Sequence, residues 1–348
     1  MKQPSDQNQS ILVVGPAWVG DMVMAQSLFK IIKQTNPLTN IDVIAPEWTF
    51  SVLHCMPEVR QAIALPLQHG EFNFRKRLSI AKQLRNKYSQ AIVLPNSWKS
   101  ALIPWLAKIP QRSGWLGELR FGLLNDWRIL DKKRYKLMIE QFMALGLPAN
   151  HPLPTPYPYP QLAVTTDNQL RAAQKLNISV KPAQPILALG AGAAFGSSKR
   201  WPATYFAQLA HHYLELDWQV WLFGSPQDQP ITAEIMQLTS NRCINIAGKT
   251  ELAETIALLS LATGVVSNDS GLMHLAAAVD KPVIAIYGST SPNFTPPLTN
   301  KAQILQLALS CQPCFARECP LQHHNCMKNI YPQQVIAAVE KWLRPCES

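Results

Sequence analysis

Hydrophobic residues in this chain gather in short runs that alternate with longer amphipathic stretches. Four apolar runs in the first part of the chain predict buried strands, at residues 11–15, 41–45, 62–65 and 91–94. Residues 21–33 place apolar side chains three and four positions apart, which predicts a helix, and residues 74–88 predict a second, basic helix. Strands that alternate with helices are typical of a doubly wound parallel sheet.

The same alternation begins again after a proline-rich segment, residues 151–161 (HPLPTPYPYPQ), which we interpret as a linker because proline favours extended chain and donates no hydrogen bond to a sheet. Beyond it, strands are predicted at residues 185–189, 219–223, 243–246, 264–267 and 282–287, and helices at 201–216, 251–262, 271–279 and 332–343. We therefore predict an α/β protein of two Rossmann-like doubly wound domains, residues 1–155 and 156–348, with a ligand cleft between the carboxyl ends of their strands.

Length and composition agree with two folded domains. The chain has 348 residues, 47% of them hydrophobic, which is enough to bury two cores. It contains no long apolar run that predicts a transmembrane helix, and its polar start, MKQPSDQNQS, is unlike a secretory leader, so we expect a cytoplasmic protein. The net charge of +10 suits an anionic partner (nucleic acid, an anionic membrane or an acidic saccharide), or only a solvated basic surface.

A loop that contains glycine joins the first predicted strand to the first helix. It has the sequence GPAWVGD, residues 15–21, and Asp21 stands where the helix is expected to begin. The aspartate can be an N-cap that accepts hydrogen bonds from backbone N–H groups. It can also be a carboxylate at the ligand cleft, placed to act as a general base.

The segment GAGAAFGSSKRWP, residues 190–202, is the most informative loop. It follows a predicted strand, and its glycines free backbone N–H groups beside a helix start and two cations, which together favour a bound diphosphate. A dinucleotide fingerprint fits poorly because the glycines are one residue too far apart, and a P-loop is excluded because Cys243 stands where it needs glycine. The candidate ligands are Gly192, Gly196, Ser197, Ser198, Lys199 and Arg200.

A third polar turn joins a strand to a helix in SNDSGLMHLAAAVDKP, residues 267–282. Asp269 and Ser270 can cap this helix while their remaining polar groups face the cleft. His274 lies one turn into the helix, either as a buried structural residue or beside a ligand. Since all three loops follow carboxyl ends of predicted strands, we expect them to converge on one site.

Four cysteines stand close together near the end of the chain: Cys311, Cys314, Cys319 and Cys326. Their C-x2-C-x4-C-x6-C spacing supplies enough thiolates for a tetrahedral Zn²⁺ ion. Reduced thiols that only pack within a loop are the alternative. A redox pair or a disulfide framework is disfavoured in a cytoplasmic protein.

Five tracts resemble, in the same order, glycosyltransferase family nine, the ADP-heptose-dependent heptosyltransferases. They are GPAWVGDMVMAQSLF, PNSWKSALIPWLAKIPQRSGWLGELRFGLLND, FGSSKRWP, SNDSGLMHLAAA and CQPCFARECPLQHHNCM, and they span nearly the whole chain. The resemblance implies a GT-B architecture, two Rossmann-like domains that face a central cleft, with the last helix packed back on the N-terminal domain. It also implies an inverting enzyme that moves heptose from ADP-heptose to a heptose hydroxyl of the bacterial lipopolysaccharide inner core.

The tracts match the heptosyltransferase II branch of the family, with branches I and III as alternatives. A non-enzymatic basic protein that binds a membrane surface or nucleic acid is a further alternative. By the resemblance, Asp21 matches the family's general base and Lys199 the lysine on the donor diphosphate. The family's usual glutamate is replaced by Ala194, so any role of that carboxylate is absent or taken by another residue. The family's turn that contacts the donor sugar and phosphates is matched by Asp269, Ser270 and Gly271, and a histidine close to it is matched by His274.

The acceptor is expected on the N-terminal domain, opposite the nucleotide. Asn96 and Ser97 follow the strand at residues 91–94, so they should lie at the carboxyl edge of the sheet, where Lys99 and Arg120 can meet an acidic sugar. Asn96 can instead only cap the next helix.

Two clusters of basic residues suit binding to the anionic surface of the inner leaflet. Each Lys or Arg near such a surface contributes about 1 kcal/mol of electrostatic attraction. The clusters are Arg75, Lys76, Arg77, Lys82, Arg85 and Lys87, and Lys132, Lys133, Arg134 and Lys136. No nucleic-acid-binding motif occurs, so we expect an enzyme peripheral to the inner membrane and no nucleic-acid partner. The chain also lacks an Asp-x-Asp pair to hold a divalent cation on the donor. No cofactor is therefore expected to be required, and zinc at the cysteine segment would be structural.

Overall fold

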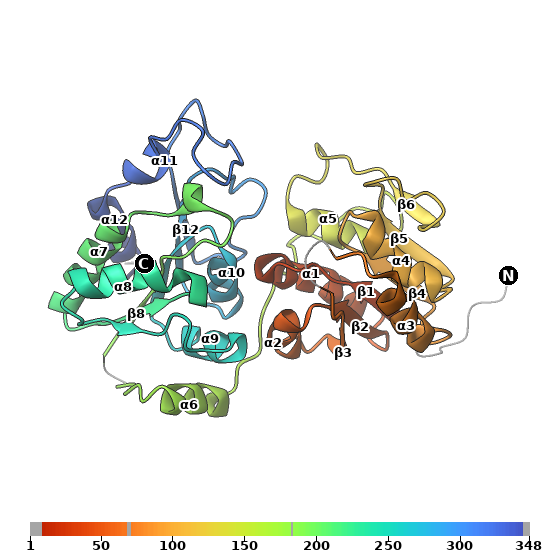
Figure 1. Ribbon diagram of the computed structural model, residues 1–348, viewed down its shortest axis with the longest axis horizontal. Coiled ribbons are helices and arrows are strands. Elements are labelled where there is room, and N and C mark those ends of the chain that lie inside the picture. Colours follow the sequence, from red (N-terminus) through yellow and green to blue (C-terminus); the bar gives the residue numbers. More distant parts are fainter. Residues whose placement is uncertain (1–8, 68–70, 182–183, 344–348) are drawn as a thin grey trace. The chain divides into compact units, whose positions relative to one another are not determined.

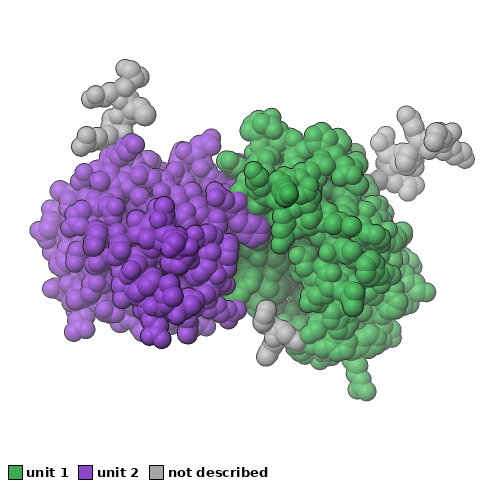
Figure 2. Space-filling view, turned by 90° about the horizontal axis from the view of Figure 1, so that it is seen from above, with its two compact units in different colours: residues 1–160 green, residues 161–348 purple. Residues whose placement is uncertain are grey.

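The computed structural model describes residues 9–67, 71–181 and 184–343. The chain divides into two compact units, residues 1–160 and 161–348, so the division falls at the end of the proline-rich segment (Figure 2). Each unit is built around one six-stranded sheet whose strands pair in parallel. The predicted α/β class is confirmed for both units.

The first unit has the strand order β3-β2-β1-β4-β5-β6 (Figure 1). Its strands are β1 (Ser10–Val14), β2 (Asn40–Ala45), β3 (Val59–Ala64), β4 (Gln90–Val93), β5 (Gln111–Trp115) and β6 (Asp126–Arg128). Its helices are α1 (Val19–Thr35), α2 (Phe50–His54), α3 (Phe74–Leu84), α4 (Trp98–Leu106) and α5 (Met138–Leu145), with a 3-10 turn, η1 (Glu47–Thr49). α1 packs against α5 and α3 against α4. The central strands are buried over nearly their whole length, which is why they are continuous apolar runs.

The second unit repeats this topology with the order β12-β11-β10-β7-β8-β9 (Figure 1). Its strands are β7 (Ile186–Gly190), β8 (Gln219–Phe223), β9 (Ile244–Asn245), β10 (Gly264–Asn268), β11 (Val283–Tyr287) and β12 (Ala302–Gln306). Its helices are α6 (Thr166–Lys175), α7 (Ala203–Glu215), α8 (Gln229–Leu238), α9 (Leu252–Leu259), α10 (Gly271–Ala278), α11 (Asn325–Lys328) and α12 (Pro332–Leu343), with 3-10 turns η2 (Ser197–Lys199) and η3 (Pro226–Asp228).

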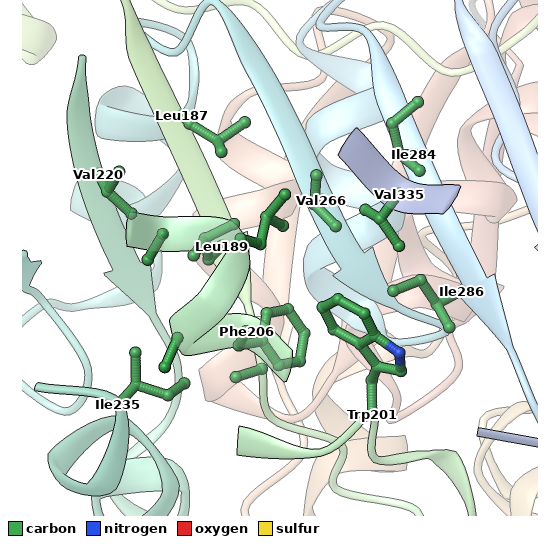
Figure 3. Packing of buried hydrophobic residues seen from close by; sticks show 14 of the residues in the cluster. Leu187, Leu189, Trp201, Phe206, Val220, Ile235, Val266, Ile284, Ile286 and Val335 are labelled. Carbon is green, nitrogen blue, oxygen red and sulfur yellow. The ribbon is translucent and has the colours of Figure 1, made fainter. Parts of the chain in front are cut away.

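The core of the second unit anchors the chain that follows the glycine loop. Trp201 and Phe206 are fully buried, with ring centroids 4.8 Å apart in an edge-on contact (Figure 3). The Trp201 indole also donates a hydrogen bond to the Ile330 carbonyl at 2.7 Å. Burial of one such side chain contributes about 1.5–3 kcal/mol, so the loop ends at a firmly held residue. The neighbours in this cluster include Leu187, Leu189, Val220, Ile235, Val266, Ile284, Ile286 and Val335.

The strand order of each sheet reverses between two central neighbours, β1 and β4 in the first unit and β7 and β10 in the second. Chains that leave such neighbours at their carboxyl ends diverge to opposite faces of the sheet and leave a crevice there. The loops at residues 15–18, 94–97, 191–202 and 269–270 all begin at these four strands. Each unit therefore places its predicted site residues at its own crevice.

Several predicted elements differ from the observed ones. The helix predicted at 74–88 ends at Leu84, because Asn86 is left-handed (φ 59°) and Tyr88 turns inward to donate to Asp42 at 2.6 Å. The strands β5, β6 and β12 and the helices α5, α6 and α8 were not predicted. β6 and β12 lie at the edges of their sheets, where polar residues break the apolar pattern, and β5 begins with the polar residues Gln111, Arg112 and Ser113.

The last helix, α12, packs against α7 and β11 of the second unit. Its predicted return to the N-terminal domain stays a prediction. None of the helices within the described ranges is both long and apolar enough to cross a membrane.

Candidate active site

The loop after β1 brings Asp21 into the first turn of α1. A side chain at Gly15 would meet Met22 at 2.7 Å, so glycine lets the chain turn close to the helix. α1 begins at Val19 after an extended Trp18, and Asp21 is therefore not its N-cap. The half-buried carboxylate lies near the positive end of the helix and just beyond the carboxyl end of β1. The N-cap alternative is wrong, and the position suits a base that faces the crevice.

The loop after β4 carries Asn96 and Ser97, and α4 starts directly after them. Neither residue caps the helix: Ser97 makes no capping bond, and the Trp98 amide donates to Glu118 Oε2 at 3.0 Å. The Asn96 side chain instead accepts a hydrogen bond from Arg120 at 3.3 Å. The capping alternative for Asn96 is therefore wrong. Asn96 is exposed and Ser97 half-buried at the carboxyl edge of the sheet, with a half-buried Lys99 in the first turn of α4.

The prediction that Arg120 contacts an acidic sugar is wrong, because the Arg120 side chain is completely buried. Its guanidinium donates to the carbonyl oxygens of Trp115 and Ser97, and to that of Pro95 at 2.7 Å. Burial lowers its pKa to about 10, with Glu118 acting in the opposite direction. The five donors of one guanidinium can satisfy several carbonyl groups at once, so Arg120 joins the loop after β4 to the segment after β5.

A cavity of about 480 Å³ lies near the carboxyl ends of β2 and β3 and was missed by the sequence analysis. Trp48 is half exposed beside it and donates through its indole to the Ala17 carbonyl at 2.9 Å, which ties the cavity to the loop before Asp21. An aromatic residue in a short polar turn is the only local signal for it. The lining residues are Glu47, Trp48, Leu65, Pro66, Leu67, Glu71 and Lys76.

In the second unit, the glycines after β7 stand where side chains do not fit. A Cβ at Gly192 would lie 2.2 Å from the carboxylate carbon of Asp228, and a Cβ at Gly196 would lie 2.1 Å from the Arg317 carbonyl oxygen. Gly196 has an extended backbone (φ 161°), so it is needed for space and not for an unusual torsion angle. The loop is therefore pressed between two other segments of the unit.

The serines of this loop differ in their surroundings. Ser197 and Arg200 are exposed, as a ligand-binding role requires. Ser198 is buried, its hydroxyl lies 2.8 Å from that of Ser289, and it donates to the Ala316 carbonyl. The prediction that the Ser198 side chain binds the donor is wrong; it holds the loop in place.

Lys199 and Asp269, predicted as separate contacts to the donor, form an ion pair. Lys199 Nζ lies 2.6 Å from Asp269 Oδ2, and the two side chains are only 13% and 4% exposed. Thr290 also donates to Asp269 Oδ2, and the ammonium lies 4.9 Å from the ring centroid of Phe195. An anion that binds Lys199 must therefore compete with a buried carboxylate.

The first turn of α10 lies directly after Asp269. Ser270 occupies the N-cap position, but its side chain makes no capping hydrogen bond within the described residues and instead lies 3.3 Å from the Ser267 hydroxyl. Since Asp269 faces Lys199, the prediction that these two residues cap α10 is wrong. The amides at Gly271 and beyond, at the positive end of the helix, suit an anionic ligand.

His274 is nearly buried, as its structural interpretation requires, yet none of the described residues hydrogen-bonds its Nδ1. Burial lowers the pKa of His274 to about 4; Asp269 acts in the opposite direction and Lys199 adds to the shift. The ring is therefore neutral at physiological pH. A neutral ring with one unbonded nitrogen can still hydrogen-bond a ligand group.

The four clustered cysteines are reduced; Cys314 is exposed and the others are half-buried. In the described ranges, no three His, Cys, Asp or Glu side chains are arranged as they stand to hold a metal ion. Zinc at this segment stays a prediction.

Known relatives match almost the whole chain. The sequence profile of glycosyltransferase family 9 (heptosyltransferase) matches residues 77–325. Lipopolysaccharide heptosyltransferase 2 of Salmonella typhimurium is 41% identical over 343 residues, which cover 96% of this chain and 98% of that protein. Lipooligosaccharide heptosyltransferase 2 of Haemophilus influenzae is 46% identical over 309 residues, covering 86% and 88%. The solved structure of Escherichia coli ADP-heptose LPS heptosyltransferase II has a TM-score of 0.85 at 39% identity, over 96% of this chain and 98% of that one.

The profile includes the loops after β4, β7 and β10, and the full-length relatives add the loop after β1. The two parallel-sheet units match a GT-B-like heptosyltransferase, so the expected GT-B fold is confirmed. A non-enzymatic role is excluded by the same matches. The chain belongs to glycosyltransferase family 9, the heptosyltransferases.

Proposed function

We propose that this enzyme transfers heptose from ADP-heptose to a heptose hydroxyl of the lipopolysaccharide inner core, with inversion at the anomeric carbon. The names of the Salmonella and Haemophilus relatives support a lipopolysaccharide acceptor and the heptosyltransferase II branch over I or III. The name of the E. coli structure supports ADP-heptose as donor. The observation that carries the proposal is the buried Lys199–Asp269 pair between the glycine loop and the first turn of α10.

The second unit offers positive charge where a diphosphate would bind. Lys199 supplies an ammonium group, the exposed Arg200 a guanidinium, and α10 the amides of its first turn. These groups stabilise the charge that the leaving ADP gains as its bond to the sugar breaks. Once Lys199 turns to the phosphates, the Asp269 carboxylate is released to accept a hydrogen bond from a donor hydroxyl.

Asp21 supplies the base on the first unit. A heptose hydroxyl is a weak nucleophile at neutral pH, so it needs to lose its proton as it attacks. The proton passes to Asp21, the oxygen bonds to the anomeric carbon, and the electron pair of the broken bond leaves on the β-phosphate of ADP. One displacement on the face opposite ADP inverts the configuration, through a transition state that resembles an oxocarbenium ion.

We expect no divalent cation to be required at the diphosphate. The chain has no Asp-x-Asp pair, and Lys199, Arg200 and the α10 amides supply the charge that a cation would bring.

The experiment that tests the proposal compares Asp21→Asn with Asp167→Asn, which changes another first-turn aspartate, in α6. Turnover is measured by mass spectrometry with ADP-heptose and a truncated lipopolysaccharide that ends in heptose. Asp21→Asn should lower kcat about 10²- to 10⁴-fold and leave ADP affinity unchanged, while Asp167→Asn should behave as wild type. Near-normal turnover of Asp21→Asn would show that Asp21 is not the general base. Transfer only to an acceptor without heptose would show that the acceptor is not a heptose hydroxyl.

The first unit also has a surface suited to an anionic membrane, and we propose that α3 docks there. Arg75 and Lys82 are exposed and seven residues apart, hence on one face of the helix. Phe72 and Phe74 are exposed beside them, and aromatic rings favour the interfacial region of a bilayer. Arg77 does not belong to this surface, because it is buried and donates to the Lys99 carbonyl at 2.9 Å.

Sedimentation with phosphatidylglycerol vesicles tests the docking. Arg75→Gln/Lys82→Gln should bind less than wild type, by about thirtyfold if each of the two charges contributes about 1 kcal/mol. The control Lys181→Gln/Lys328→Gln, which removes two exposed charges from the second unit, should bind as wild type. If both variants lost vesicle binding equally, net charge and not α3 would be the cause. If wild type bound phosphatidylcholine vesicles as well as phosphatidylglycerol vesicles, an electrostatic contact would be excluded.

A further inference from the structure

Arg317 lies in the long segment between β12 and α11, and its backbone is joined to the glycine loop of the second unit. Its carbonyl oxygen accepts a hydrogen bond from the Ser198 amide at 3.1 Å, and the Ala316 carbonyl accepts one from the Ser198 hydroxyl. A Cβ at Gly196 would clash with the same Arg317 carbonyl oxygen, so the two segments are in direct contact. The backbone of Arg317 is therefore held against the turn that carries Lys199.

Two further hydrogen bonds hold this segment to the chain that follows β11. The Phe315 amide donates to the Ser289 carbonyl at 2.7 Å, and the Gln312 side chain donates to the Gly288 carbonyl at 2.6 Å. Both carbonyl groups come directly after the carboxyl end of β11, which pairs with β10 in the sheet. Residues 312–317 therefore lie at the edge of the second sheet where the proposed donor site is.

The guanidinium of Arg317 and the ammonium of Lys199 contact the same aromatic ring. Arg317 Cζ lies 5.8 Å from the ring centroid of Phe195, and Lys199 Nζ lies 4.9 Å from it. The negative face of an aromatic ring attracts cations, so Phe195 stabilises both positions. The two cationic groups are at most about 11 Å apart, a distance that one diphosphate can bridge with a hydrogen bond at each end.

Arg317 differs from Lys199 in having no carboxylate partner. Its side chain is exposed, and it takes part in none of the ion pairs within the described ranges, whereas Lys199 is paired with Asp269. The Lys199–Asp269 pair carries no net charge and must open before the ammonium can bind an anion. The guanidinium needs no such exchange, and its parallel N–H donors match two oxygens of a phosphate group.

We propose that Arg317 binds the diphosphate of the nucleotide donor together with Lys199, and that Phe195 positions both cations. The inference rests on the proposed function, because it takes ADP-heptose as the donor, and it assigns a role to a segment that the proposed mechanism does not use. The charge on the diphosphate grows as its bond to the sugar breaks. A cation that stays on the phosphates therefore also favours the departure of ADP.

The first test measures the affinity of the full-length protein for ADP, AMP and adenosine by calorimetry. Arg317→Gln removes the charge and keeps the backbone carbonyl that Ser198 contacts. It should raise the Kd of ADP about tenfold, raise that of AMP less, and leave that of adenosine unchanged, because adenosine has no phosphate. Arg171→Gln, which changes another exposed arginine, in α6, is the matched control and should bind all three as wild type does.

Two results of this test would overturn the contact. One is an unchanged ADP affinity in Arg317→Gln while Lys199→Met binds ADP more weakly. The other is an equal loss for ADP and adenosine, which would show that Arg317 acts on the nucleoside or on the fold and not on the phosphates. Failure of the wild-type protein to bind ADP would instead refute the proposed donor, so the two failures are distinguishable.

The second test concerns the ring that contacts both cations. Phe195→Leu keeps an apolar side chain and removes the aromatic face, so ADP affinity should fall. The fall should be smaller in the Arg317→Gln background than in wild type, because the ring acts partly through the guanidinium. Equal falls in the two backgrounds, or no fall in either, would overturn the positioning role of Phe195.

Discussion

Replacement of Asp269 by asparagine should strengthen ADP binding, whereas loss of Lys199 should weaken it. In the structure, Lys199 Nζ is already paired with Asp269 Oδ2 at 2.6 Å, and both side chains are shielded from water. ADP must displace this carboxylate and then lie near its negative charge. Asp269→Asn keeps the volume and can still accept the hydrogen bond from Thr290, while it removes both the competition and the repulsion.

The magnitudes follow from the exchange of partners. A charge-assisted hydrogen bond contributes about 1.5–3 kcal/mol, and wild type loses part of this in breaking the pair. Lys199→Met should therefore weaken ADP binding by about 1.5 kcal/mol, roughly tenfold in Kd. Asp269→Asn should tighten it by about 1 kcal/mol, roughly fivefold, since it relieves one partly screened repulsion.

Calorimetry with ADP is the suitable assay, because ADP lacks the sugar that Asp269 is proposed to contact. Asp280→Asn is the matched control: it breaks an exposed pair with Lys301, also at 2.6 Å, and should leave ADP affinity unchanged. In the double variant Lys199→Met/Asp269→Asn, the two effects should not add, because the residues contact each other. Weaker ADP binding in Asp269→Asn, equal to that in Lys199→Met, would refute the competition and make Asp269 a direct support of the nucleotide.

Four further predictions concern other residues and the ion requirement. His274→Gln should reduce the stability that the protein loses as the pH falls from 6.5 to about 4. Burial lowers the pKa of His274 in the folded protein to about 4, so in this range only the unfolded chain binds a proton at this residue, which costs wild type roughly 3 kcal/mol of folding free energy. Thermal melts of wild type and His274→Gln across this pH range measure the difference, and an equal fall of both melting temperatures with pH would contradict the prediction. Arg120→Leu should destabilise the first unit by about 3 kcal/mol, since it leaves buried carbonyl groups without donors, and the acceptor KM of the folded enzyme should not change. If Arg120→Leu raised the acceptor KM without a loss of stability, Arg120 would be a contact to the acceptor sugar after all. Lys99→Gln should raise the acceptor KM but not the ADP Kd, in steady-state assays whose difference shrinks as salt rises; a change confined to ADP would reverse the assignment of substrates to units. Activity should survive EDTA, and recovery of lost activity with Mg²⁺ alone would show a cation at the diphosphate.

The local pattern of the chain was sufficient for the two sheets and for the place of the loops. Central strands such as β1 and β10 are buried over nearly their whole length, so each is an apolar run bounded by turn residues. Because carboxyl ends of parallel strands share one edge, the glycine loop and the turn at Asp269 could be assigned to one site before any contact was known. The edge strands β6 and β12 were missed, since their solvent-facing positions are polar, whereas the edge strands β3 and β9 were predicted.

Only the tertiary structure decided what the polar side chains do. Lys199 and Asp269 are 70 residues apart, and they meet because β7 and β10 are neighbours in the sheet. Arg120 and Ser198 resemble ligand-binding residues in sequence, yet they are buried because backbone carbonyls of distant loops meet them there. Periodicity along the chain reports which positions face a core, because that depends on local geometry. The partner of a charge depends on which strands lie side by side, and the local pattern carries no record of it.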